Sequence, residues 1–94
     1  MKKIELNSIE YSLEKNYKDG FVLEDVVDLC TDYFVPYDYI FGDYSYSKLR
    51  LKGFYDTNNK KAKEFNDIKG LEDYIKNYCS YDCKYFLLKK EKDK

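Results

Sequence analysis

The residues best suited to do chemistry gather between positions 37 and 56, in the segment YDYIFGDYSYSKLRLKGFYD. Aromatic rings of this kind can stack on nucleobases or anchor a protein interface, and the cations can bind phosphate or carboxylate groups. The candidate binding residues are Tyr39, Phe41, Asp43, Tyr46, Arg50, Lys52 and Phe54. The segment predicts either an exposed binding surface or an aromatic-rich half of the core, in which Arg50 and Lys52 pair with nearby Asp side chains.

One carboxylate in this segment has a position suited to catalysis. Asp43 follows Gly42 where a loop is expected to begin. It could act as a catalytic or metal-binding carboxylate, although an Asp near a turn more often accepts hydrogen bonds from backbone N–H groups. Capping is the favoured interpretation, and a small enzyme centred on Asp43 and Arg50 is the alternative.

The cysteines and the remaining polar motifs do not complete a known catalytic or metal-binding pattern. Cys79 and Cys83 are separated by three residues rather than two, the chain has no His and Cys30 is the one remaining Cys, so a zinc site would need Asp82 or another carboxylate. Buried packing is the favoured role for these cysteines, and a thiol switch is the alternative. The segment 56–60 begins like a calcium loop but lacks its next ligand and its Gly. No cofactor or metal is therefore expected.

Composition indicates one small domain in the cytoplasm. The chain has 94 residues, 19% of them aromatic, and bulky rings fill the thin core that a domain of this size can form. The net charge of −1 argues against a chain that binds nucleic acid over its whole surface. An apolar run of membrane length, a signal-peptide pattern and an even number of cysteines are all absent. We expect one domain over 1–90 and a charged, solvated tail over 91–94, with no membrane contact.

The first half of the chain alternates between strand and helix patterns. Residues 4–6 and 9–13 alternate apolar and polar side chains and predict a hairpin, and Asp-Gly at 19–20 predicts a turn. A helix follows, because its apolar side chains recur at helical spacing before Pro36 ends it. Those side chains are Leu23, Val26, Val27, Cys30 and Phe34.

The second half repeats the strand and helix patterns in the same order. Segments 37–43 and 48–55 are rich in β-forming residues, and a polar connection spans 56–64. Asn66 or Asp67 can cap a second helix. Its apolar stripe consists of Leu71, Tyr74, Ile75 and Tyr78. Segment 84–89 is a last, buried strand. The order β-β-α-β-β-α-β predicts an α+β domain with a mainly antiparallel sheet and two helices, or a ferredoxin-like fold if the first strand is separate.

The number of loop residues in the central hairpin decides which side chains share a face. With two or four loop residues, Tyr39 lies opposite Lys52 and Phe41 opposite Arg50, and one face is aromatic and cationic. With three or five, the rings join Leu49 in the core and the cations lie on a polar face. A slip of one residue exchanges the two arrangements.

Several ordered motifs of the chain resemble those of one protein family. They are Tyr37-Asp38-Tyr39-Ile40 with Gly42-Asp43, then Leu49-Arg50-Leu51-Lys52-Gly53-Phe54, then Tyr78-Cys79 and Cys83-x-Tyr85-Phe86. Over roughly residues 11–90 the sequence resembles the YutD-like family of small proteins from Gram-positive Bacillota. It departs from the family pattern at Tyr44, Ser45, Val22 and Asp82. The resemblance implies a cytosolic bacterial α+β domain, and it implies no particular activity, substrate or catalytic residue.

Three functions remain open on the sequence alone. The leading hypothesis is a non-enzymatic binding or regulatory module that holds a protein partner with its Tyr and Phe side chains. The second is an RNA- or nucleotide-binding domain that uses Arg50, Lys52 and exposed rings. The third is the small enzyme centred on Asp43 and Arg50.

Overall fold

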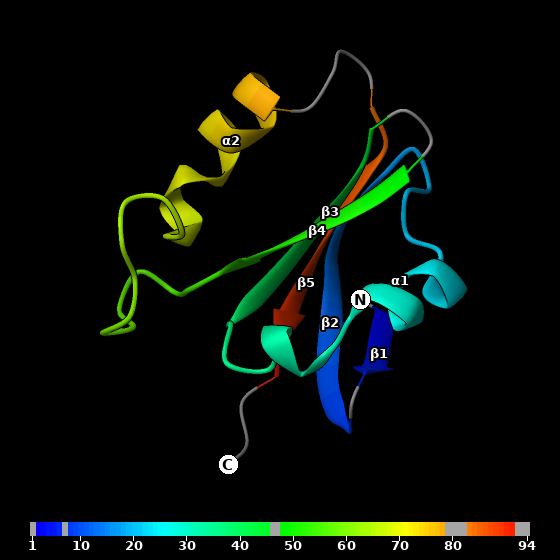
Figure 1. Cartoon of the computed structure of the whole chain (residues 1–94), viewed down its shortest axis with the longest axis horizontal. Coiled ribbons are helices and arrows are strands. Elements are labelled where there is room, and N and C mark those ends of the chain that lie inside the picture. Colours follow the sequence, from blue (N-terminus) through cyan, green and yellow to red (C-terminus); the bar gives the residue numbers. More distant parts are fainter. Residues whose placement is uncertain (1, 7, 46–47, 79–82, 92–94) are drawn as a thin grey trace.

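The computed structural model describes residues 2–6, 8–45, 48–78 and 83–91. A five-stranded sheet runs through the molecule, with one helix on each of its faces (Figure 1). The elements in chain order are β1 (Lys2–Leu6), β2 (Ile9–Tyr17), α1 (Leu23–Leu29), the 3₁₀ turn η1 (Asp32–Phe34), β3 (Tyr39–Ser45), β4 (Lys48–Phe54), the 3₁₀ turn η2 (Ile68–Gly70), α2 (Leu71–Tyr78) and β5 (Tyr85–Lys90). This sequence of elements confirms the predicted α+β class and the order β-β-α-β-β-α-β.

The strand order in the sheet is β1-β2-β5-β3-β4. Each of the four neighbouring strand pairs is antiparallel, and β5 joins the N-terminal hairpin to the central hairpin. Strands β2 and β3 run parallel with the antiparallel β5 between them, so β2, α1 and β3 form a split βαβ unit. The ferredoxin-like alternative is nevertheless wrong, because that fold packs both helices on one face of its sheet, whereas α1 and α2 lie on opposite faces here.

One face of the sheet packs against α1 and η1. Val26, Cys30 and Phe34 contribute to a buried cluster on this face, and strand side chains complete it. Those strand residues are Ile4, Leu6, Tyr11, Ile40, Phe86 and Leu88. The predicted helix is shorter than expected, because Cys30 leaves the helical conformation with ψ 88° and Phe34 follows in a separate turn. Val26 is the buried residue within α1, while Leu23 and Val27 face solvent.

The opposite face packs against α2. Phe41, Phe54 and Leu87 of the sheet are buried against Leu71, with Tyr74 and Ile75 packed beside them. The predicted apolar stripe of the second helix is confirmed for the three of its members whose burial the structure describes, Leu71, Tyr74 and Ile75. Asp67 caps the turn that leads into α2 by accepting a hydrogen bond from the backbone N–H of Lys69.

Two glycine-related features fix the local geometry of the sheet. Lys18 and Asp19 both have positive φ, 57° and 55°, and the Gly20 N–H donates to the Tyr17 carbonyl, so the predicted turn is confirmed. At Gly42 in β3, a Cβ atom would lie 2.1 Å from the Phe86 ring of neighbouring β5. The missing side chain at Gly42 therefore makes room for a core aromatic.

Within the described ranges, no helix combines the length and apolar character needed to cross a membrane.

Candidate functional site

The loop of the central hairpin contains an even number of residues. This is the case in which the aromatic and cationic side chains are expected on the same face. Strand β3 ends at Ser45 and β4 begins at Lys48, so two residues separate them. Side chains of Tyr39 and Phe41 therefore share a face with Lys52. The predicted pairing is wrong by two residues, because Phe41 lies opposite Lys52 and Asp43 lies opposite Arg50. Strand β3 continues two residues closer to the turn than expected, to Ser45, while β4 begins at Lys48 as expected, and this shifts the register without exchanging the faces.

Helix α2 covers the centre of this face. Phe41 and Phe54 are each 1% exposed, and the Tyr74 ring meets both edge-on at centroid distances of 5.7 Å. The structure thus supports the core alternative for these two rings and not an open stacking platform. Tyr46 lies outside the described residues.

Asp43 and Arg50 form an ion pair on the same face. The Arg50 guanidinium donates from Nη2 to Oδ2 over 2.5 Å and from Nε to Oδ1 over 3.2 Å. The side chain of Asp43 is 2% exposed and that of Arg50 is 46% exposed. Asp43 therefore lies inside a strand rather than in a loop as the capping role required, and Arg50 balances its buried charge.

Lys52 lies over three aromatic rings beside α2. Its Nζ is 5.1 Å from the Phe54 centroid, 5.7 Å from that of Tyr74 and 6.0 Å from that of Phe65. These groups border a pocket of about 560 Å³, which we call the Phe65 pocket. Its lining residues are Lys52, Phe54, Glu64, Phe65, Asp67, Gly70, Asp73, Tyr74 and Asn77.

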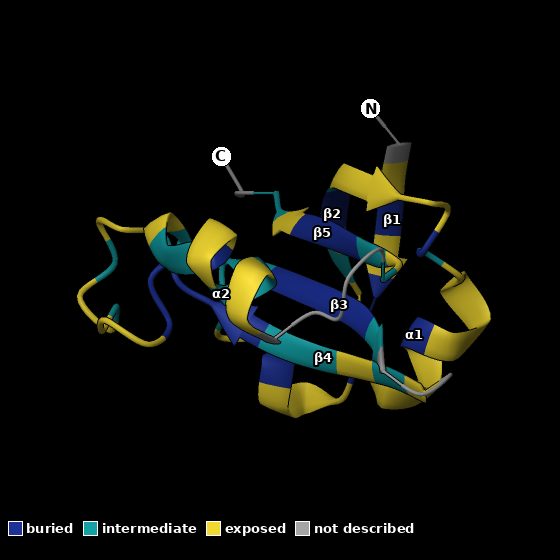
Figure 2. Ribbon diagram, turned by 90° about the horizontal axis from the view of Figure 1, so that it is seen from above, coloured by how far each residue is buried: buried dark blue, intermediate teal, exposed yellow. Residues whose placement is uncertain are grey.

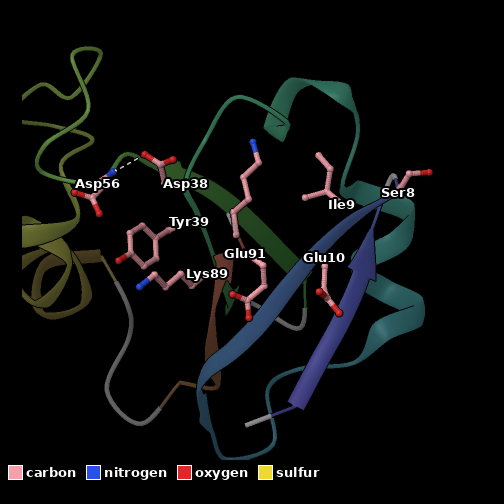
Figure 3. A pocket seen from close by; sticks show the side chains of 9 residues that line it. Ser8, Ile9, Glu10, Asp38, Tyr39, Asp56, Lys89 and Glu91 are labelled. Atoms are coloured by element: carbon pink, nitrogen blue, oxygen red, sulfur yellow. Dashed lines mark hydrogen bonds between the residues drawn. The ribbon is translucent and has the colours of Figure 1, made fainter. Parts of the chain in front are cut away.

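Tyr39 lines a different hollow, the Tyr39 groove, of about 430 Å³ (Figure 3). Its walls mix acidic and basic side chains, with Glu10 and Glu91 facing the same space as Lys89. At the edge of the groove, the Oδ2 atom of Asp38 accepts a hydrogen bond from the backbone N–H of Asp56 over 2.8 Å, which links the two lining residues. Burial raises the pKa of Tyr39. The sequence-predicted residues Tyr39 and Lys52 therefore border separate hollows.

A third surface lies on α1 and η1, and it contains none of the binding residues predicted from the sequence. We call the exposed apolar side chains there, together with their acidic neighbours, the α1 surface. The apolar members are Val22, Leu23, Val27, Leu29 and Tyr33, and the acidic members are Glu24, Asp25, Asp28 and Asp32. In Figure 2 most of α1 is exposed and a single buried segment faces the sheet.

Two signals in the sequence point to this α1 surface. No Lys or Arg occurs between Lys18 and Lys48, whereas Asp and Glu recur through that interval. The apolar residues of α1 also spread around the helix axis over a wider arc than contact with the sheet can bury. In the structure, Val26 is the residue of the helix that is buried. For the Phe65 pocket the corresponding signal is an aromatic side chain next to the polar connection 56–64.

The cysteines that the structure describes do not form a reactive pair. Cys30 is buried and is not part of a disulfide, and burial raises the pKa of its thiol. Cys83 is free and half-buried, and Cys79 lies outside the described residues. Among the residues with described positions, no group of three or more His, Cys, Asp or Glu side chains is arranged to hold a metal ion.

Comparison with known proteins identifies the family. A family model described as "Putative antitoxin YutD-like" matches residues 5–89. A curated relative, "Putative antitoxin YutD" of Bacillus subtilis (strain 168), is 44% identical over 85 residues, which cover 90% of this chain and 93% of the relative. The solution NMR structure of protein yutD from B. subtilis superposes with a TM-score of 0.82 at 41% identity, covering 99% of this chain and 84% of that one. The chain belongs to the YutD-like family.

Proposed function

We propose that this chain is a protein-binding module of the antitoxin kind, which counteracts a toxic protein by binding it through the α1 surface. The description of the B. subtilis relative supports the antitoxin role. The observation that carries the proposal is the exposure of the apolar residues on α1. Val27 at the middle of the helix is 53% exposed, and Leu23 one turn earlier is 45% exposed.

Apolar exposure is concentrated at this surface. Five of the seven large hydrophobic residues that are exposed in the described part of the chain lie between positions 22 and 33. Single exposed apolar side chains are ordinary, but a contiguous group with a polar rim is typical of a protein interaction site. Leu23 and Val27 lie one turn apart on α1, so these exposed apolar side chains are neighbours, and the exposed carboxylates of Glu24, Asp25 and Asp28 lie on the same short helix.

The charge of the rim defines the chemistry of the partner. Glu24, Asp25 and Asp28 are exposed on α1, and the Tyr44 hydroxyl donates to Asp25 over 3.2 Å. Such a surface repels phosphate and attracts a protein patch that combines Lys or Arg with an apolar centre. The acidic rim also speeds association with a basic partner at low ionic strength.

This proposal keeps the adaptor hypothesis and moves it from the central hairpin to α1. The RNA-binding hypothesis needs open rings beside the cations, and α2 covers the rings of Phe41 and Phe54. The enzyme hypothesis needs an accessible Asp43, whose side chain is 2% exposed. A cytoplasmic location is part of the proposal, and it is supported by the reduced state of Cys30 and Cys83, which are not part of a disulfide.

The test is an affinity capture from a lysate of a Gram-positive host, with and without nuclease. Val27→Glu places a charge in the apolar centre of the α1 surface. Lys61→Gln makes the same change in net charge at an exposed position of the 56–64 connection and is the matched control. We expect a nuclease-resistant protein that the wild type and the control retain and Val27→Glu loses. Co-expression should then show that the wild type relieves growth inhibition by that protein.

Two results would contradict the proposal. Recovery of material that nuclease removes would favour the RNA-binding hypothesis instead. Equal capture by Val27→Glu and wild type would show that α1 does not contact the partner.

A further inference from the structure

The Phe65 pocket lies on the α2 face of the sheet, opposite the α1 surface, and it is independent of the function proposed above. Its walls come from three elements, with Lys52 on β4, Phe65 in the connection before η2, and Tyr74 on α2. Phe65 is 71% exposed, the highest value among the large hydrophobic residues that the structure describes. A ring held open beside a 560 Å³ pocket offers a flat face to a ligand.

The pocket already holds one cation of the chain itself. The Lys52 ammonium lies within 6.0 Å of all three ring centroids, a distance at which the ring quadrupole attracts positive charge. The aromatic walls are therefore arranged for a cation, and Lys52 occupies the position between them. A second cation has to use the outer face of Phe65 and the carboxylates at the rim.

The rim carboxylates differ in how far they are already engaged. Asp67 accepts from the Thr57 hydroxyl over 2.6 Å and from the Lys69 N–H over 3.0 Å, and these hydrogen bonds lower its pKa. Glu64 and Asp73 are exposed at the pocket rim. With Lys52 as the one cation in the lining against three carboxylates, the pocket carries net negative charge.

We propose that the Phe65 pocket binds the arginine side chain of a polypeptide partner. A guanidinium is flat, so it can stack on the Phe65 ring and donate in its own plane to a carboxylate. An ammonium is a point charge and would compete with Lys52 for the centre of the three rings. The exposed ring and the rim carboxylates of Glu64 and Asp73 therefore favour arginine over lysine.

The test is an NMR titration of the full chain with N-acetyl-arginine amide. The neutral analogue N-acetyl-citrulline amide has nearly the same shape and is the matched probe. We expect amide shifts at Phe65, Tyr74 and Asn77 that saturate with a dissociation constant in roughly the millimolar range, as for a single side chain. Citrulline should bind at least about fivefold more weakly, since it lacks the charge.

Variants on the pocket surface separate binding from folding. Phe65→Ala removes an exposed ring and should weaken arginine binding by about three- to fivefold. Asp73→Asn should weaken binding by about two- to fivefold, and Glu72→Gln, the neighbouring exposed carboxylate on α2 outside the pocket lining, should leave it unchanged. The spectrum outside the pocket should stay the same in all three variants.

Three outcomes would overturn the proposal. Equal affinity for the citrulline probe would show that the pocket does not recognise charge. Arginine shifts that persist unchanged in Phe65→Ala would place the binding elsewhere. Free arginine that binds more than about tenfold more tightly than the blocked amide would identify a free amino acid as the ligand.

Discussion

The Asp43–Arg50 ion pair lends itself to a double-mutant cycle that tests its structural role. Arg50→Met keeps the aliphatic stem and removes the guanidinium, and Asp43→Asn keeps the shape and removes the charge. Lys48→Met is the matched control, because Lys48 is exposed on the same strand and the same face. Unfolding in urea is followed by far-UV circular dichroism and tyrosine fluorescence, since the chain contains no Trp.

The geometry sets the expected size of the effect. Arg50 donates one short and one longer hydrogen bond to a carboxylate that is 2% exposed, so Asp43 has little access to water if Arg50 is lost. Hydrogen bonds to charged groups contribute about 1.5–3 kcal/mol. Arg50 is half-exposed, so its guanidinium is hydrated again when Asp43 is replaced. The coupling energy between Arg50 and Asp43 should therefore be near the lower end of this range, about 1.5–2 kcal/mol.

Arg50→Met should therefore lower the free energy of unfolding by about 2–3 kcal/mol, because it leaves a buried carboxylate unbalanced. With a urea m-value of about 1–1.5 kcal/mol/M, the midpoint falls by roughly 2 M. Lys48→Met should change stability by less than about 0.5 kcal/mol. A coupling energy below about 0.5 kcal/mol, or equal costs for Arg50→Met and Lys48→Met, would refute the structural role.

Other positions give equally direct tests. Gly42→Ala should destabilise the fold by about 1–3 kcal/mol in urea unfolding, because the new methyl group meets the Phe86 ring, whereas Gly70→Ala has 3.9 Å to its nearest neighbour and should be neutral. The Cys30 thiol should be alkylated far more slowly at neutral pH in the folded chain than in urea, because burial raises its pKa; equal rates by mass spectrometry would contradict this. Burial raises the pKa of Tyr11 from 10.0 to about 12, so the neutral ring stabilises the fold fully below pH 10 and progressively less as pH rises to 12. Tyr11→Phe should reduce that alkaline loss of stability, as measured by urea midpoints across the interval.

Local patterns predicted much of the fold correctly. Alternating side chains predicted the N-terminal hairpin and β-forming residues predicted the central one, and helical spacing predicted that Leu71, Tyr74 and Ile75 face the sheet. The hairpin faces followed from a single property, an even or odd loop. The pairing of Phe41 with Lys52 did not follow, because an even loop fixes only the faces, while the register depends on the residue at which each strand ends.

The candidate site was harder to predict because it depends on contacts distant in the sequence. Side-chain types alone do not show that α2 covers Phe41 and Phe54. Either face of the central hairpin could have been the one exposed to solvent. Helix α1 shows the opposite error, because residues that were expected to be buried are exposed. Its apolar residues predicted a buried stripe, but the seven-residue helix meets the sheet through Val26 and leaves Val27 exposed.

The position of β5 determines when the chain can fold. Strand β5 follows all the other described strands in the sequence and pairs with both β2 and β3. Tyr11 therefore cannot pair with Lys90, nor Tyr39 with Lys89, until β5 has been synthesised. Until then the nascent chain holds two separate hairpins, each with an apolar face uncovered and an unpaired edge. Pairing over such separations is slow, and exposed edges invite aggregation or proteolysis. The sheet can therefore form as one unit only after β5 has been synthesised, and removing β5 would divide the sheet rather than shorten it.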